Sequence, residues 1–252
     1  QVAGLAAGFR AGPASSSQIY SVKVFKQTSS TSDSQNACVD GAKLGDLVEG
    51  VNWIQSNIAS TGRPSVVNMS LGIPADASGV SVLEEEIQEL INSGATVVTS
   101  SGNENQDACN FSPGRMQGVI NVNASFYNGY EEFTSNPSGV QEGRASFSNF
   151  GTCTDIYAPG ERVLSADNAS IGASDLISGT SFAAPLVTGA AAMLLEFQPN
   201  LTPAQVKADL LALATDISFN NAGPGDADKF LYVPRPYPRT PDAFVITRAL
   251  AN

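Results

Sequence analysis

Short apolar segments with the composition of strands alternate with segments that carry apolar residues at helical spacing, and this alternation restricts the fold more than any other feature. Strands are predicted at residues 19–25, 65–69, 95–100 and 118–124. Helices are predicted between them, the first with its apolar face along 44–58. Because strands that alternate with helices form right-handed βαβ units, the sequence predicts an α/β fold with a mostly parallel sheet.

Helix signals are present in both halves of the chain. A capping box, Ser81 followed by Glu84, predicts the start of the second helix. Residues 181–195 are apolar or small on every side of a helix, which predicts a helix buried in the core. Thr202 and Pro203 predict the start of a last helix, since proline is well tolerated at the first helical position.

Two polar segments are predicted to lie outside the regular elements. Residues 26–41 are rich in Ser, Thr, Asp and Gly, which predicts a loop. After Tyr232 the chain is rich in Pro and Arg, so residues 233–252 are expected to form an extension packed on or trailing from the surface.

The net charge of the chain limits the classes of molecule that it is expected to bind. The formal net charge is −11, and the 13 Lys and Arg residues form no long run. An acidic surface repels phosphate backbones, so we expect no nucleic-acid partner. No apolar run reaches the ~18–20 residues that span a bilayer, so we expect no membrane partner. The chain opens on Gln1 without the pattern of a signal peptide, and it is interpreted as a processed chain or a fragment.

Ser181 lies at the start of the predicted buried helix, within the sequence SGTSFAAP (178–185). The helix dipole and the backbone N–H of Ser181 can stabilise an oxyanion there, as a nucleophilic serine requires. The alternative is that Ser178 or Ser181 only caps the helix. A nucleophilic serine also needs a base that takes its proton, usually a histidine. The chain contains no histidine.

Asn103 follows Gly102 directly after the strand predicted at 95–100. A side-chain amide in this position can donate a hydrogen bond to a developing oxyanion, which contributes roughly 3–4 kcal/mol in serine hydrolases. The alternative is an ordinary Gly-Asn turn. In parallel sheets, sites form in the loops after the carboxyl ends of the strands, and both 70–72 and 101–103 are loops of this kind.

Several segments together resemble the subtilisin-type serine proteases, most of all the branch of proteinase K and aqualysin. They follow the family's order and are VVNMSLG (66–72), SGNEN (101–105), RASFSNFG (144–151), DIYAPG (155–160) and SGTSFAAPLVTGAAAMLL (178–195). The resemblance covers nearly all of residues 1–232. It implies the C-terminal portion of a single catalytic domain with a three-layer α/β/α fold, in a secreted protein.

The resemblance implies roles for individual residues. Ser181 would be the nucleophile, and Asn103 the side chain of the oxyanion hole. The cleft that binds a peptide as an added β-strand would be lined by Gly41, Ser70, Leu71, Gly72, Ser100, Ser101, Gly102 and Thr180. Chemistry of this kind requires no cofactor.

The same resemblance accounts for the missing base. Residues 1–8, QVAGLAAG, resemble the continuation of the family's motif His-Gly-Thr-His-Val-Ala-Gly, with Gln1 in place of its second, non-catalytic histidine. The catalytic histidine would lie just before Gln1, and the catalytic aspartate further upstream. Cys38 is expected to form a disulfide with this upstream segment.

The resemblance also implies a disulfide and a metal site within the chain. Cys109 and Cys153 match paired positions of the aqualysin-like branch. Asp155 matches a calcium-site carboxylate, and the backbone carbonyls of Gln117 and Val119 would complete a set of hard oxygen ligands for a structural calcium ion. The alternative is an aspartate that pairs or caps locally.

Three functions remain open from the sequence. The first is a serine endopeptidase that acts through an acyl-enzyme, with His and Asp supplied by the upstream segment. The second is an inactive protein on the same scaffold, which acts as a binding subunit, an inhibitor or a toxin component. The third is a serine-carboxyl peptidase that uses Glu and Asp; it is disfavoured because no matching Glu/Asp helix is visible.

Overall fold

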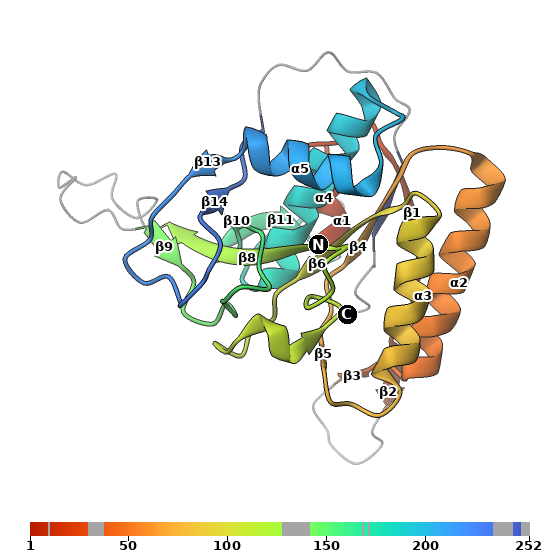
Figure 1. The fold of residues 1–252 in the computed structure, drawn as a ribbon, viewed down its shortest axis with the longest axis horizontal. Helices are drawn as coiled ribbons and strands as arrows, with labels where there is room; N and C mark the ends of the chain where they lie inside the picture. Colours follow the sequence, from red (N-terminus) through yellow and green to blue (C-terminus); the bar gives the residue numbers. More distant parts are fainter. Residues whose placement is uncertain are drawn as a thin grey trace.

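A mostly parallel sheet separates two groups of helices in the computed structural model of the chain (Figure 1). The structure describes residues 1–9, 11–29, 38–127, 142–167, 169–170, 172–233 and 244–247. The helices are α1 (Val2–Ala7), α2 (Leu44–Thr61), α3 (Val80–Asn92), the 3₁₀ turn η1 (Ala108–Asn110), α4 (Thr180–Phe197) and α5 (Pro203–Leu213). The strands are β1 (Gln18–Ser21), β2 (Lys26–Ser29), β3 (Cys38–Gly41), β4 (Ser65–Met69), β5 (Ile73–Pro74), β6 (Thr96–Ser100), β7 (Phe111–Ser112), β8 (Ile120–Tyr127), β9 (Glu142–Arg144), β10 (Ile156–Pro159), β11 (Val163–Ala166), β12 (Ser174–Ile177), β13 (Thr215–Asp216), β14 (Lys229–Phe230) and β15 (Phe244–Thr247).

The main sheet has the strand order β1-β15-β4-β6-β8-β10-β14-β13, with β9 paired to β8. Neighbouring strands from β1 to β14 run parallel, and β13 and β9 pair antiparallel. The predicted mostly parallel α/β sheet is therefore confirmed. Of the 26–41 segment, which was predicted to be a loop, β2 and β3 pair as a separate antiparallel ribbon.

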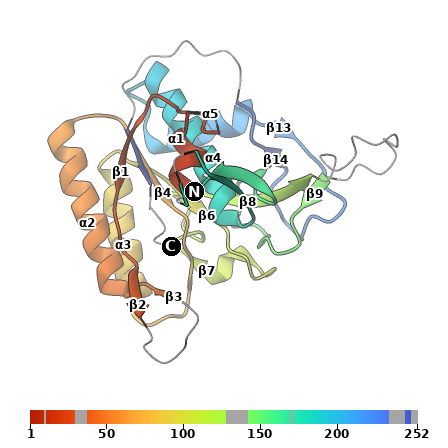
Figure 2. The ribbon, with the colours of Figure 1, turned by 180° about the vertical axis from the view of Figure 1, so that it is seen from behind.

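Alternate residues of the buried strands face opposite helix layers. Val66 and Val98 pack with the cluster around α1, α4 and α5, whereas Val67 and Val97 pack with the cluster around α2 and α3. All four side chains are at most 1% exposed. Strands that are covered on both faces are continuously apolar, which is why these runs were recognisable in the sequence. Seen from behind, α2 and α3 lie on one flank of the sheet and α1 and α4 near its centre (Figure 2).

The N-cap of α3 lies two residues before Ser81, the N-cap that the sequence predicted. Its N-cap is Gly79, in the left-handed region at φ 83°, and no side chain caps the helix. Glu84 does not reach back to the N-cap; its carboxylate binds Arg115 instead, with a 2.6 Å bond from Nε to Oε1 and a 2.9 Å bond from Nη2 to Oε2. The prediction of a capping box at Ser81 and Glu84 is therefore wrong. The predicted helix start at Thr202 and Pro203 is confirmed, and the structure adds a capping box there between Thr202 and Gln205.

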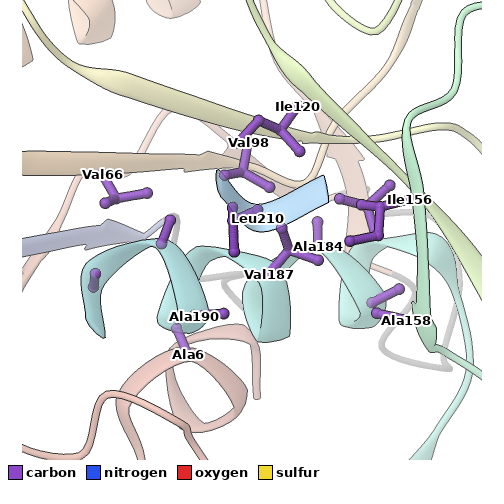
Figure 3. Packing of buried hydrophobic residues seen from close by; sticks show 14 of the residues in the cluster. Ala6, Val66, Val98, Ile120, Ile156, Ala158, Ala184, Val187, Ala190 and Leu210 are labelled. Atoms are coloured by element: carbon purple, nitrogen blue, oxygen red, sulfur yellow. The ribbon is translucent and has the colours of Figure 1, made fainter. Parts of the chain in front are cut away.

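The helix α4 passes through the middle of the core. Ala184, Val187 and Ala190 lie between the sheet and α1, whose Ala6 contacts the outer side of the helix (Figure 3). The two helices approach closely at Gly189, where a Cβ atom would lie 2.4 Å from the carbonyl oxygen of Ala6. Only glycine fits this contact, since no rotamer change can move a backbone oxygen.

The same helix is long and apolar enough, by length and composition, to cross a membrane, and it is the one such helix among the described residues. Within the fold, however, 67% of that window is buried against other elements. Its apolar surface is therefore used by the core, as the sequence pattern of small and apolar residues predicted.

The C-terminal segment is partly built into the sheet, which differs from the prediction of a surface extension. Residues 244–247 form β15, which lies between β1 and β4 rather than on the surface of the domain. The expected surface extension over 233–252 is therefore wrong for this stretch. Without β15, β1 and β4 would each expose an unpaired row of backbone N–H and C=O groups. The sequence of β15, FVIT, consists of residue types that favour strands.

A half-buried carboxylate fastens the loop before β14 to the sheet. Asp226 accepts a 2.7 Å hydrogen bond from Asn123 Nδ2 and a second bond from the hydroxyl of Tyr157. The side chain of Tyr157 is fully buried. Burial, together with the bond to Asp226, raises the pKa of Tyr157 well above its ordinary value of 10.0. The hydroxyl therefore remains a donor at pH values at which an ordinary tyrosine would be ionised.

Candidate active site

Ser181 lies in the first turn of α4, against the loop that follows β4. The Ser70 hydroxyl donates a 2.8 Å hydrogen bond to the Ser181 carbonyl, and the Ser181 hydroxyl lies 3.4 Å from the Ser70 carbonyl. Ser70 is itself held by a 2.8 Å bond from Asn68 Nδ2, and Thr188 of α4 donates to Asn68 Oδ1 at 3.0 Å. The helix α4 and the end of β4 are thus joined by two hydrogen bonds, one at Ser181 and one at Thr188. Ser181 remains partly exposed.

The amide of Asn103 is oriented by Thr180. Asn103 Oδ1 accepts hydrogen bonds from the backbone N–H of Thr180 at 2.8 Å and from its hydroxyl at 2.9 Å. Because the oxygen is held, the NH₂ end turns toward the start of α4, where a Cβ built at Gly179 would lie 3.7 Å from Asn103 Nδ2. Among the described residues this NH₂ group has no hydrogen-bond acceptor, and the side chain is exposed. The NH₂ donor therefore lies beside Gly179, two residues before Ser181 in the chain.

The buried side chain of Asn149 holds the loop that carries Asn103 by hydrogen bonds. The sequence suggested no role for this residue. The Asn149 side chain is fully buried and donates to the carbonyl of Ser101 at 2.9 Å and to Glu104 Oε2 at 2.7 Å. Its oxygen accepts from the backbone N–H groups of Glu104 at 3.1 Å and Gln106 at 2.9 Å. One side chain therefore fixes both ends of the turn.

Gly102 allows this arrangement. Its φ is 107°, a conformation that residues with a side chain rarely adopt, and a Cβ would lie 2.2 Å from Asn149 Nδ2. Its backbone N–H points to the Thr180 hydroxyl at 3.3 Å. Glycine is required here because the chain turns sharply over the buried amide.

The structure brings most of the predicted lining residues to one edge of the sheet. β4 and β6 are neighbours, with Met69 paired to Thr99, so the loops after them emerge side by side. In these loops and at the end of β6, Ser70, Ser100 and Ser101 are buried, Leu71 is half-buried and Gly72 is exposed. Thr180, at the start of α4, is buried as well. Gly41 ends β3 in the separate ribbon with β2, and the contacts of the described residues do not connect it to Ser181.

The cysteines are only partly described. Cys109 and Cys153 form the predicted disulfide, with their Cα atoms 5.2 Å apart. The bond joins η1, just after the Asn103 loop, to the turn that follows Asn149. The side chain of Cys38 lies outside the described residues, so its bond to an upstream segment stays a prediction.

The three predicted calcium ligands do lie together, but an ammonium group is among them. Lys207 Nζ lies 2.7 Å from Asp155 Oδ1, 2.8 Å from the carbonyl oxygen of Val119 and 3.4 Å from that of Gln117. In the described part of the chain, no group of three His, Cys, Asp or Glu side chains is placed to hold a metal ion.

The partner of the Ser181 hydroxyl is a carbonyl oxygen and not a base, and the chain has no histidine to supply one. Comparison with known proteins identifies the family of the chain. The family model of the subtilases matches residues 1–230. The chain belongs to the subtilase family. An extracellular serine proteinase of Thermus sp. (strain Rt41A) is 39% identical to this subtilase over 197 residues, which are 78% of the chain and 43% of the relative.

Two further relatives agree. The subtilisin-like serine protease pepC of Aspergillus niger is 34% identical over 233 residues, 84% of this subtilase and 38% of the relative. The crystal structure of a cold adapted subtilisin-like serine proteinase superposes with a TM-score of 0.73 at 32% identity, covering 92% of this chain and 72% of that one. This subtilase spans less than half of the length of the Thermus and Aspergillus relatives. It has the subtilisin-like three-layer α/β fold.

Proposed function

We propose that this chain carries the nucleophile and the oxyanion hole of a secreted serine endopeptidase of the subtilisin type. The observation that supports the proposal is the pair formed by Ser181, at the amino end of α4, and the Asn103 amide, which Thr180 orients toward it. A helix start and an aligned amide donor together provide the electrostatic environment that an acyl-transfer oxyanion needs.

In the proposed reaction, a base removes the proton of the Ser181 hydroxyl while its oxygen attacks the carbonyl carbon of a peptide. The carbonyl oxygen becomes an oxyanion, which accepts hydrogen bonds from Asn103 Nδ2 and from the backbone N–H of Ser181. When the C–N bond breaks, the base returns the proton to the leaving amine and an acyl-enzyme remains. Water then attacks the ester with the help of the same base and restores the Ser181 hydroxyl.

The base and its carboxylate partner would come from a segment upstream of Gln1. The proposal is supported by the absence of histidine from the chain and by the 43% share of the Thermus relative that the chain spans. Cys38 would bind this segment covalently.

The substrate would be an extended peptide that lies between the rims at 70–72 and 100–102. These rims consist of Ser, Leu and Gly, so they offer little charge selectivity, and we expect broad specificity with a preference for apolar residues. Extracellular action agrees with the disulfide and with the name of the Thermus relative.

The second candidate is an inactive subtilase fold that binds a partner, and the missing histidine is the observation that favours it. A fluorophosphonate probe distinguishes the two, because it labels only a serine that a base activates. We expect the protein, isolated with its complete natural chain, to be labelled at Ser181, and a Ser181→Ala variant to remain unlabelled. A folded protein that resists the probe and cleaves no peptide would overturn the endopeptidase proposal and favour the binding function.

A further inference from the structure

The predicted calcium ligands are already satisfied by a side chain of the same protein. Lys207 extends from α5, and its Nζ makes a 2.7 Å ion pair with Asp155 Oδ1 and a 2.8 Å hydrogen bond to the Val119 carbonyl, with the Gln117 carbonyl at 3.4 Å. The side chains of Lys207 and Asp155 are only 22% and 20% exposed. The ion pair is thus largely shielded from solvent and screened less than a surface pair.

The number and direction of the donors match this arrangement. An ammonium group has three N–H donors and no acceptor, and three oxygens surround Nζ. The second oxygen of the Asp155 carboxylate is already bound, since Oδ2 accepts from the backbone N–H of Asn121 at 2.8 Å. One negative carboxylate faces one positive ammonium, so the site is neutral without any ion.

The same residues do not fit calcium while Lys207 is in place. Calcium requires six to eight oxygen ligands at about 2.3–2.6 Å, and its charge would repel an ammonium that occupies the centre of the site. The Nζ–oxygen distances of 2.7 and 2.8 Å are those of charge-assisted hydrogen bonds.

The position of Lys207 follows from the packing of α5. The Thr202 capping box fixes the first turn of this helix, and Val206 and Leu210 are buried against the core at 0% and 3% exposure. Lys207, next to Val206, is therefore directed toward the start of β8 whenever α5 is docked. The cation is covalently part of the helix, so, unlike a bound ion, it is present at the site without any supply from solution.

We propose that Lys207 is a built-in cation that replaces calcium at this site, so that the Asp155 site of this protein binds no divalent ion. The inference is independent of the proposed protease function, because it concerns only ion binding and stability. It predicts that removing Lys207 creates a calcium site in which Asp155 and the two carbonyls are free to bind the ion.

The test measures the melting temperature of the protein with its complete natural chain, in calcium chloride and in EDTA. Four proteins are compared: the unchanged protein, Lys207→Ala, Asp155→Asn and the double variant. Comparison with Asp155→Asn cancels any calcium effect that arises elsewhere in the molecule.

We expect the unchanged protein and Asp155→Asn to show the same calcium response. We expect Lys207→Ala to gain an additional rise of about 3 °C or more at free calcium tenfold above its dissociation constant, and the double variant to lose that gain. The proposal is overturned if Asp155→Asn abolishes a calcium response of the unchanged protein, or if folded Lys207→Ala gains none. If Lys207→Ala does not fold, Lys207→Ser takes its place, and the first comparison still decides.

Discussion

Replacing Asn149 tests whether its buried amide holds the loop that carries Asn103. Asn149→Ala removes two donated and two accepted hydrogen bonds. The freed groups of Glu104 and Gln106 lie on exposed residues and can bind water, so they contribute little. The Ser101 carbonyl belongs to a residue that is 1% exposed, and leaving it without a donor costs about 1–3 kcal/mol. With the loss of the side chain's packing, we expect a destabilisation of about 2–4 kcal/mol.

The measurement is urea unfolding of the complete protein with Ser181→Ala as background, which prevents self-digestion. Gln106→Ala is the matched control, because its exposed side chain makes no described contact and only its backbone N–H and carbonyl are used. A change within ~0.5 kcal/mol is expected. Under the proposed function, with Ser181 intact, the loosened loop should lower kcat more than it raises KM, since Asn103 would donate mainly in the transition state. If Asn149→Ala unfolds within ~0.5 kcal/mol of its parent, the amide does not hold the loop and the reasoning is wrong.

Three other predictions follow from the described contacts. Gly102→Ala should destabilise the protein by more than ~2 kcal/mol in urea unfolding, because of its positive φ and the clash beneath it, whereas Gly72→Ala, with nothing within 4 Å, should change little; equal effects would refute this. Asp226→Ala removes the carboxylate at the centre of its buried network and should cost about 2–4 kcal/mol by the same measurement, and a neutral result would contradict the assigned network. The bond from Arg115 lowers the pKa of Glu84 below its ordinary 4.5. The ion pair therefore stabilises the fold above that pH, and its contribution is lost as the pH falls through the lowered pKa. The melting temperature, measured between about pH 3 and 6, should change less with pH in Glu84→Gln than in the unchanged protein, and identical profiles would disprove the coupling.

The parts of this fold that could be predicted from the sequence are those whose cause is local. β4 and β6 are buried on both faces, so their apolar residues are contiguous and mark the strands directly. The buried helix α4 was recognisable from its small and apolar residues, and Thr202 marked the start of α5 because capping involves neighbours in the chain. The strand-to-loop positions of Ser70 and Asn103 followed from the same reasoning.

What could not be predicted depends on partners distant in the chain. Asn149 acts on a loop 45 positions earlier, and its motif gave no indication that the side chain points inward. Lys207 reaches Val119 across 88 positions, so no local pattern connects it to the oxygens it binds. The Ser81 capping box failed because Arg115, 31 positions away from Glu84, offers that carboxylate a charged partner.

The burial of α4 has a consequence for how activity and structure are lost. Amide protons in a central helix exchange with solvent only through global unfolding, whereas exposed loops open by local fluctuations that need far less free energy. Ser181 lies in the first turn of the buried helix α4, while Asn103 lies on an exposed turn. On warming, hydrogen exchange should therefore appear first in the turn that carries Asn103, while the segment that follows Ser181 is still protected. Thermal inactivation would then precede global unfolding, and it would be reversible as long as α4 remains folded.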